Sequence, residues 1–220
     1  MISSDDILQT IKNLAKLIEE GHFKYIGLSE VSADTIRRAH KVHPIAAVEM
    51  EYSFWSTEIE SNGVLATCKE LRIPLISYSS VAPSIALRKH LTESTGSPLG
   101  RGFLTGSIKS RADIPAGDMR LMFDRFSEEN FPKNLVIVDK LALIAAKKSI
   151  SLAQLAIGWT IAMSTFPIPG STRPEGVEES IAGAFIEFTE AELKEIREII
   201  DETKITGGRY NSHMEGQLTQ

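Results

Sequence analysis

The run "FPIPGSTRPEGVEES" at residues 166–180 combines residue types that bind anions. Its apolar start predicts a strand over 166–169, and Pro174 suits the first position of a helix, where its missing N–H costs nothing. The turn between them holds small residues and one cation: Gly170, Ser171, Thr172 and Arg173. Free N–H groups at a helix start attract anions, and an arginine can bind a phosphate with two hydrogen bonds. The run therefore predicts a phosphate-type site, with an ordinary capped helix as the alternative.

Hydrophobic periodicity predicts the elements that must position this turn. We expect strands over 24–30, 45–53, 73–79 and 166–169. We expect helices over 5–20, 32–42, 60–71, 133–149, 151–163 and 174–184, and a last helix from Thr189, where "TEAE" has the capping-box form. Strands that alternate with helices predict an α/β fold with a parallel sheet and right-handed crossovers.

Ligands of such folds bind at the carboxyl ends of the strands. The residues at the four predicted ends are polar, small or aromatic: Ser29 and Glu30, Glu51 to Ser53, Tyr78 and Ser79, and Gly170 to Arg173. This pattern predicts a ligand-facing rim, and the alternative is a set of polar loop ends that face water.

Composition narrows the class of protein. The chain has 220 residues, 42% of them apolar, and a net charge of −5, which argues against a nucleic-acid surface. Cys68 is the single cysteine, which excludes an internal disulfide and a cysteine-based zinc site, and no metal site is predicted. The start lacks a secretory signal, and the apolar run 152–163 is shorter than the ~18 residues of a membrane span. We expect a soluble protein of the cytoplasm.

Five segments together resemble the aldo-keto reductases: "YIGLSE", "VEMEYSFW", "LISYS", "SPLGRGFLTG" and "IPGSTRPEGVEES". They occur in the family's order and cover nearly the whole chain except about 80–96, and they are most similar to the branch of fungal pyridoxal reductases and potassium-channel β subunits. The resemblance implies a (β/α)8 TIM barrel, here a partial barrel of strands five to eight with their helices. It implies one domain over 1–220 and hydride transfer between NADPH and a carbonyl or alcohol.

The resemblance also implies how NADP would be held at its adenosine end. Gly170, Ser171, Thr172 and Arg173 would surround the 2′-phosphate, and Gly176, Glu179 and Ser180 would flank the adenine. The family commonly has arginine or glutamine at the position of Gly176 and asparagine at the position of Ser180.

The remaining cofactor contacts follow from the same resemblance. Tyr78 would stack on the nicotinamide, Ser29 would hydrogen-bond its carboxamide, and Glu49 stands where a glutamine usually does so. Glu30 stands where the family often has asparagine. The loop over the pyrophosphate would use Ser97, Leu99 and Arg101, and Arg120 would help to clamp the cofactor.

No catalytic residue is expected within this chain. The family's Asp, Tyr, Lys and His lie near the ends of strands two to four, and by resemblance this chain begins at the helix after strand four. The histidines present are expected to be structural or exposed: His22, His40, His43, His90 and His213.

The segment from Ser80 to Phe131 contains no convincing sheet element. The segment is far longer than an ordinary loop of ~12–15 residues. In the family, strand seven leads directly into the cofactor loop, whereas 80–97 intervenes here. We expect 80–97 to be an insertion, read through from a short intron that would begin at the valine codon after Ser80. The alternative is a genuine loop.

These observations favour an NADP-dependent oxidoreductase that reduces an aldehyde or ketone, with pyridoxal as a candidate substrate. A non-catalytic NADP-binding regulatory module is a second interpretation. A small doubly wound domain for another phosphate ligand is a third, although no G-x-G-x-x-G follows a predicted strand. The expected partner is a small carbonyl compound, with neither nucleic acid nor membrane, and open barrel edges would favour self-association.

Overall fold

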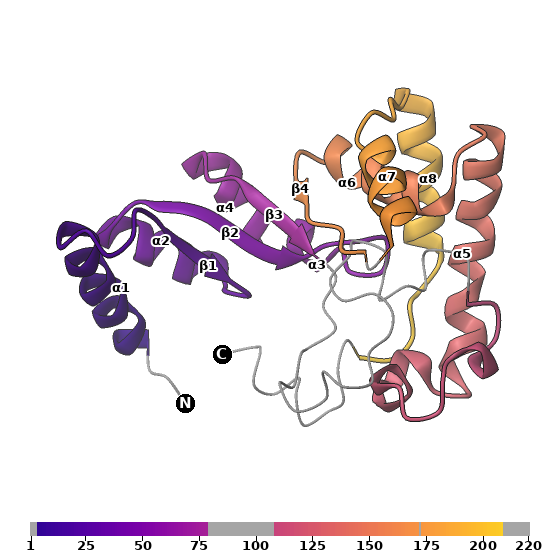
Figure 1. Ribbon diagram of the computed structural model, residues 1–220, viewed down its shortest axis with the longest axis horizontal. Coiled ribbons are helices and arrows are strands. Elements are labelled where there is room, and N and C mark those ends of the chain that lie inside the picture. The colour runs from indigo at the N-terminus through magenta and orange to yellow at the C-terminus, as the bar shows by residue number, and fades with distance from the viewer. Residues whose placement is uncertain (1–3, 79–107, 172, 209–220) are drawn as a thin grey trace.

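The computed structural model describes residues 4–78, 108–171 and 173–208. Its strands are β1 (Ile26–Ser29), β2 (Ile45–Glu51), β3 (Leu75–Tyr78) and β4 (Phe166–Pro167). Its α-helices are α1 (Ser4–Glu19), α2 (Ala33–Val42), α3 (Glu58–Ser61), α4 (Val64–Leu71), α5 (Asn130–Lys147), α6 (Leu152–Ala162), α7 (Pro174–Gly183) and α8 (Glu190–Glu202). In Figure 1, α1, α2 and α4 accompany β1 to β3, while α5 to α8 gather beside β4.

The four strands form one parallel sheet in the order β1-β2-β3-β4, which confirms the predicted α/β class. Ser29 pairs with Glu49 across β1 and β2, and Glu51 pairs with Tyr78 across β2 and β3. Because the strands are parallel and in this register, their carboxyl ends meet at one edge of the sheet.

The two faces of the sheet differ in burial. Val48, Met50 and Leu75 are at most 5% exposed and belong to the hydrophobic core. The alternate residues Glu49 and Ile76 are only half-buried, because they point to the opposite face. This second face carries Ser29, Glu49 and Tyr78, whereas the polar residue Ser77 lies on the buried face.

The single helix predicted over 60–71 was wrong, because the chain forms α3 and α4 with a break at Gly63. Gly63 has a φ of 87°, in the left-handed region that glycine enters without a steric penalty. The side chain of Asn62 accepts a hydrogen bond from the N–H of Val64 at 3.1 Å and so begins α4 anew. A left-handed residue inside a helical pattern cannot be read from apolar spacing.

Of two predictions about the helices after residue 130, one is confirmed and the other places a helix start too late. The capping box is confirmed: Thr189 Oγ1 accepts from the N–H of Glu192 at 3.2 Å, and Glu192 Oε2 accepts from the N–H of Thr189 at 2.7 Å. The helix predicted from residue 133 begins earlier, at Asn130, since Pro132 is tolerated within a first turn.

In the segment 80–131, the described residues 108–131 add no strand, as expected, and only the start of α5 is α-helical. They form three 3-10 turns, at Arg111–Asp113, Met119–Met122 and Asp124–Phe126. Arg125 is 7% exposed and donates to Ser56 Oγ and to the carbonyl of Gly207, both at 3.2 Å. This arginine therefore joins the C-terminal loop to the segment after β2.

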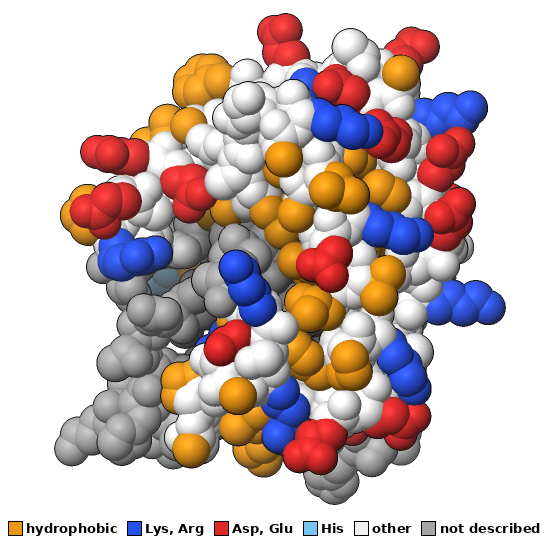
Figure 2. Space-filling model, turned by 90° about the vertical axis from the view of Figure 1, so that its right-hand side faces the viewer, with side chains coloured by type: hydrophobic (Ala, Val, Ile, Leu, Met, Phe, Trp, Pro, Cys, Tyr) orange, Lys and Arg blue, Asp and Glu red, His pale blue; other side chains and the backbone are white. Residues whose placement is uncertain are grey.

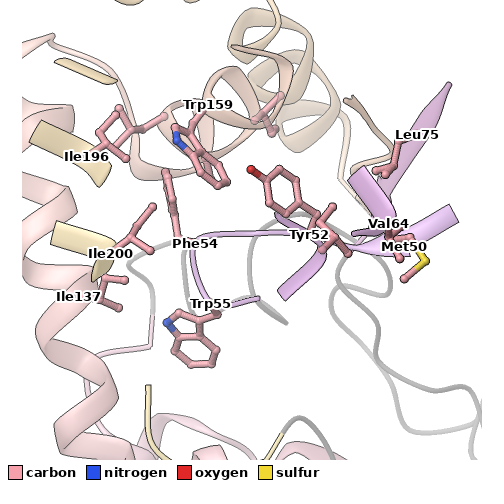
Figure 3. Close-up of a cluster of buried hydrophobic side chains, with 14 of the residues drawn as sticks. Met50, Tyr52, Phe54, Trp55, Val64, Leu75, Ile137, Trp159, Ile196 and Ile200 are labelled. Atoms are coloured by element: carbon pink, nitrogen blue, oxygen red, sulfur yellow. The ribbon is translucent and has the colours of Figure 1, made fainter. Parts of the chain in front are cut away.

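Aromatic side chains connect the end of β2 to the helices (Figure 3). Trp159 of α6 lies with its ring centroid 5.0 Å from that of Tyr52 and 4.7 Å from that of Phe54. The Tyr52 hydroxyl donates to Glu60, and Arg197 Nη2 contacts the same carboxylate oxygen at 2.6 Å. Burial, and then the Glu60 carboxylate, raise the pKa of Tyr52 far above its usual range. We call this cluster of Tyr52, Glu60, Trp159 and Arg197 the β2 anchor.

Replacing Arg197→Ala tests the β2 anchor. The change removes the ion pair between Arg197 and Glu60, which accepts the hydrogen bond of the buried Tyr52. It also removes a guanidinium that lies 5.9 Å from the centroid of the Trp159 ring. We expect the free energy of unfolding to fall by about 2 kcal/mol, measured by denaturant titration. The control is Lys194→Ala on the same helix, whose exposed pair with Glu198 at 3.8 Å should contribute less than about 0.5 kcal/mol. Equal losses in the two variants would contradict the assignment.

Candidate functional site

The sheet brings three predicted residues to one edge, the carboxyl ends of β1, β2 and β3. Ser29 is exposed at the end of β1, and Glu49, its register partner, is half-buried. Tyr78 is half-buried at the last position of β3. We call this group of Ser29, Glu49 and Tyr78 the strand-end rim.

Glu30 follows Ser29 in an unusual backbone conformation. Its φ is 52°, in the left-handed region where asparagine is several times more common than most residues. Its carboxylate Oε1 accepts a hydrogen bond from the N–H of Glu51 at 2.8 Å, and its own N–H donates to the carbonyl of Glu49 at 3.0 Å. Glu30 thus ties the ends of β1 and β2 together, at a backbone cost of about 1 kcal/mol or more.

The two carboxylates of β2 have different surroundings. Glu51 is 4% exposed, and its Oε1 accepts from Ser56 Oγ at 3.1 Å, next to the buried Arg125. Glu49 is half-buried, and its carboxylate has no hydrogen bond or ion pair with any residue that the structure describes. Glu49 is therefore the carboxylate of β2 that is free to contact a ligand.

The turn between β4 and α7 has the predicted strand–turn–helix form. The N–H of Ile168 donates to the carbonyl of Ser77 at 3.1 Å, which extends the pairing of β4 by one residue. Arg173 precedes the helix with extended backbone, and Pro174 is the first helical residue. The Arg173 guanidinium is exposed and has no partner within the described parts of the chain. An exposed cation at a helix start is the arrangement that an anion needs.

Ser171 locks this turn, and Gly176 makes room for it. The Ser171 hydroxyl accepts from the N–H of Arg173 at 3.1 Å and donates to the carbonyl of the same residue at 2.9 Å. A Cβ at position 176 would lie 2.2 Å from Ser171 Oγ, closer than real contacts allow. By the resemblance, glycine departs from the family's usual residue at position 176, and the contact with Ser171 accounts for the glycine in this chain.

Two further residues lie on α7. Ser180 Oγ donates to the carbonyl of Gly176 at 2.7 Å, so this hydroxyl serves the helix itself. Glu179 is half-buried. Their predicted contacts with adenine stay predictions, as do those of Gly170 and Ser171 with the phosphate.

Arg120 is already engaged with a neighbour. Its Nε and Nη2 lie 3.0 and 2.7 Å from the two carboxylate oxygens of Asp118, with side chains 13% and 12% exposed. Burial alone would raise the pKa of Asp118, but the hydrogen bonds from Arg120 outweigh it and lower that pKa. A cofactor would therefore meet this pair together and not a free guanidinium.

Several predictions fall outside the described residues. These are Ser97, Leu99, Arg101, Thr172, His90, His213 and the insertion expected at 80–97. Of the described histidines, His40 has a structural contact, since its Nδ1 accepts from the N–H of Ile45 at 3.1 Å. Among residues 4–78, 108–171 and 173–208, no three His, Cys, Asp or Glu side chains are grouped to hold a metal ion.

Within the same parts of the chain, no helix is both long and apolar enough to cross a membrane. The surface nevertheless carries apolar side chains. Figure 2 shows hydrophobic side chains gathered between acidic and basic ones on one face. A groove of about 660 Å³ lies between α6, β4 and α7, with Ile161, Phe166, Val177 and Ile181 among its lining.

The contact between Ser171 and Gly176 leads to a test by a double-mutant cycle. In a helix, alanine is favoured over glycine by up to about 1 kcal/mol. We expect Gly176→Ala to gain that stability in a Ser171→Ala background but not in the native sequence, where it would displace the serine. Thermal or denaturant unfolding of the four proteins gives the coupling, expected near 1 kcal/mol. Additive effects would show that Ser171 moves aside without cost.

The comparisons with known proteins agree on one family. The chain matches the model of the Aldo/keto reductase family over residues 2–201. It is 41% identical over 201 residues to aldo-keto reductase yakc, named for NADP(+), of Schizosaccharomyces pombe, covering 90% of this chain and 54% of that protein. It is 37% identical over 213 residues to aldo-keto reductase str7 of Strobilurus tenacellus, covering 95% and 58%.

Solved structures support the fold. A glycerol dehydrogenase from Gluconobacter oxydans superposes with a TM-score of 0.75 at 21% identity, over 92% of this chain and 56% of that one. An aldo-keto reductase from Klebsiella pneumoniae, solved with NADP and acetate, gives 0.59 at 18% identity, over 93% and 58%. The chain thus spans a little over half the length of these relatives, and its four-stranded sheet is consistent with part of a barrel. On the family match and the level of identity, the chain belongs to the aldo-keto reductase family.

Proposed function

We propose that this chain binds NADP(H) as part of an oxidoreductase that transfers a hydride between the cofactor and a carbonyl or alcohol. The observation that carries the proposal is the exposed Arg173 at the start of α7, whose guanidinium has no partner among the described residues. The name of the Schizosaccharomyces pombe relative specifies NADP(+), and two Klebsiella pneumoniae structures hold NADP or NADPH, which supports the choice of cofactor.

The residues present fit such a cofactor at its phosphate end. A 2′-phosphate needs positive charge and N–H donors, and the turn offers the exposed Arg173 guanidinium beside the first N–H groups of α7. The Ser171 hydroxyl already closes this turn, so its backbone is held in shape without a ligand. Arg173 then supplies the charge that distinguishes NADP(H) from NAD(H).

The strand-end rim fits the other end of the cofactor. When bound, the nicotinamide ring supplies or accepts the hydride. The Ser29 hydroxyl on β1 is exposed and can donate to the carboxamide. Tyr78 lies on β3, on the other side of β2, where its ring can hold one face of the nicotinamide. These residues bind and orient, and none of them is assigned the transfer of a proton.

The carbonyl oxygen also requires a proton, and we assign the group that donates it to strands of the family fold other than these. By resemblance, the acid and the residues that tune it lie on barrel strands that this chain does not match. The complete reaction, with an aldehyde or ketone such as pyridoxal as substrate, is therefore proposed for an assembly that contains both parts. The cytoplasmic location expected from the sequence stays a prediction.

Self-association is part of the proposal. β1 and β4 each pair with one neighbour only in the described sheet, and unpaired strand edges attract further strands. Phe166 on β4 is 60% exposed beside the groove between α6 and α7. These exposed groups favour association through the strand edges.

Arg173→Ala tests the proposed cofactor site. Removing a charge-assisted contact of about 1.5–3 kcal/mol should weaken NADPH binding by about tenfold to a hundredfold. NADH lacks the 2′-phosphate and serves as the internal control, so its affinity should stay nearly unchanged. Dissociation constants follow from the fluorescence of the bound reduced nicotinamide. Equal losses for both cofactors would mean that Arg173 acts on the fold.

A second test concerns the reaction. We expect the 220-residue chain alone to oxidise NADPH with pyridoxal or an aromatic aldehyde at a rate lower by at least about 10²–10⁴-fold than a full-length relative. The reason is that a positioned acid contributes that factor and none is assigned to the strand-end rim. Absorbance of NADPH reports the rate. Turnover at a full-length rate that Tyr78→Phe abolishes would overturn this assignment and make Tyr78 the acid.

A further inference from the structure

We propose that the strand-end rim distinguishes the two charge states of the nicotinamide and that Glu49 is the residue that determines this specificity. The oxidised ring carries a positive charge and the reduced ring is neutral, so a free carboxylate beside the ring holds NADP⁺ more tightly than NADPH. The inference rests on the proposed function and concerns the same site.

The position of Glu49 is fixed by the register of the sheet. It pairs with Ser29 on one side and with Ile76 on the other, two residues before Tyr78 on β3. Side chains two apart along a strand share a face, so the carboxylate, the serine hydroxyl and the tyrosine ring converge on the same side of the sheet. A carboxylate next to an aromatic face is a combination that favours a cationic ring over a neutral one.

The other carboxylates near this edge accept hydrogen bonds from groups of the protein itself. Glu30 accepts a hydrogen bond from the N–H of Glu51. Glu51 accepts from Ser56, whose hydroxyl also receives a hydrogen bond from Arg125, and the Arg125 guanidinium lies 3.7 Å from the carboxylate of Glu58. Arg125 is 7% exposed and further engaged with the Gly207 carbonyl. Of the two carboxylates of β2, Glu49 is the one without a hydrogen bond or ion pair to any described residue.

The expected size of the effect follows from Coulomb's law. Opposite unit charges roughly 4–8 Å apart change an affinity by about three- to thirtyfold where the effective dielectric constant is about 40–70, between the values of a protein surface and of bulk water, as on a half-buried side chain open to solvent. Glutamine keeps the shape and the hydrogen-bonding oxygen of glutamate but not its charge. For a two-electron couple, a tenfold preference for the oxidised form lowers the midpoint potential of the bound cofactor by about 30 mV. The Glu49 carboxylate should therefore make the bound, reduced cofactor a stronger hydride donor than it is in Glu49→Gln.

The experiment compares equilibrium binding of NADP⁺ and NADPH to the wild-type chain, Glu49→Gln and a matched control, Glu187→Gln. Glu187 is exposed between α7 and α8 and has no partner among the described residues, so the control removes the same charge elsewhere. NADPH is followed by its fluorescence and NADP⁺ by its competition. We expect Glu49→Gln to reduce the preference for NADP⁺ over NADPH by about three- to thirtyfold and Glu187→Gln to leave it unchanged.

The outcomes separate the two proposals. If both cofactor forms bind and Arg173→Ala weakens them, but Glu49→Gln leaves their ratio unchanged, the inference about Glu49 is wrong and the cofactor site stands. If the wild-type chain binds neither form, the proposed function falls and this inference falls with it. Thermal unfolding checks that the variants fold, and Glu49→Ala, which also removes the charge, provides the same measurement if the glutamine variant does not fold.

Discussion

The structure depends on the β2 anchor, where Tyr52, Glu60, Trp159 and Arg197 meet just beyond the end of β2. These residues come from four separate segments, and Arg197 lies 137 positions from Glu60 in the chain. The contact fastens α6 and α8 to the sheet, and α6 in turn packs on β4 and α7. The proposed phosphate turn precedes α7 and Glu49 lies on β2, so the anchor and the pairing of β2, β3 and β4 together connect the two ends of the candidate cofactor site.

Parallel pairing is the second constraint. It brings the ends of β1, β2 and β3 to one edge and separates the buried face, with Val48 and Leu75, from the face that carries Glu49. The backbone at this edge is not relaxed. Glu30 is held in the left-handed region because its N–H and its carboxylate each bond to β2. Strain of this kind persists only where surrounding contacts fix it, and it is common at ligand sites.

Charge is distributed between the two ends of the site in opposite senses. Within the described parts of the chain, the turn before α7 offers an arginine without a partner, which suits a phosphate, and the strand-end rim offers a carboxylate without a partner, which suits a cationic ring. A dinucleotide whose nicotinamide is oxidised has that same polarity, negative at the phosphate and positive at the ring. Arg120 is paired with Asp118, and its predicted contact with the cofactor stays a prediction.

The sequence alone determined the alternation of strands with helices, apart from the division of α3 from α4, and the parallel sheet. It also determined the Thr189 capping box and the strand–turn–helix at 166–180, because apolar spacing and capping residues act over a few positions. It could not determine the break at Gly63, since a left-handed residue leaves no trace in periodicity. Tertiary structure also decided three side-chain contacts. These are the fit of Ser171 against Gly176, the pairing of Arg120 with Asp118, and the hydrogen bond from Ser56 that engages Glu51 but not Glu49. In each case the outcome depends on which side chain occupies a given space or offers a given partner, and only the folded chain brings those atoms together.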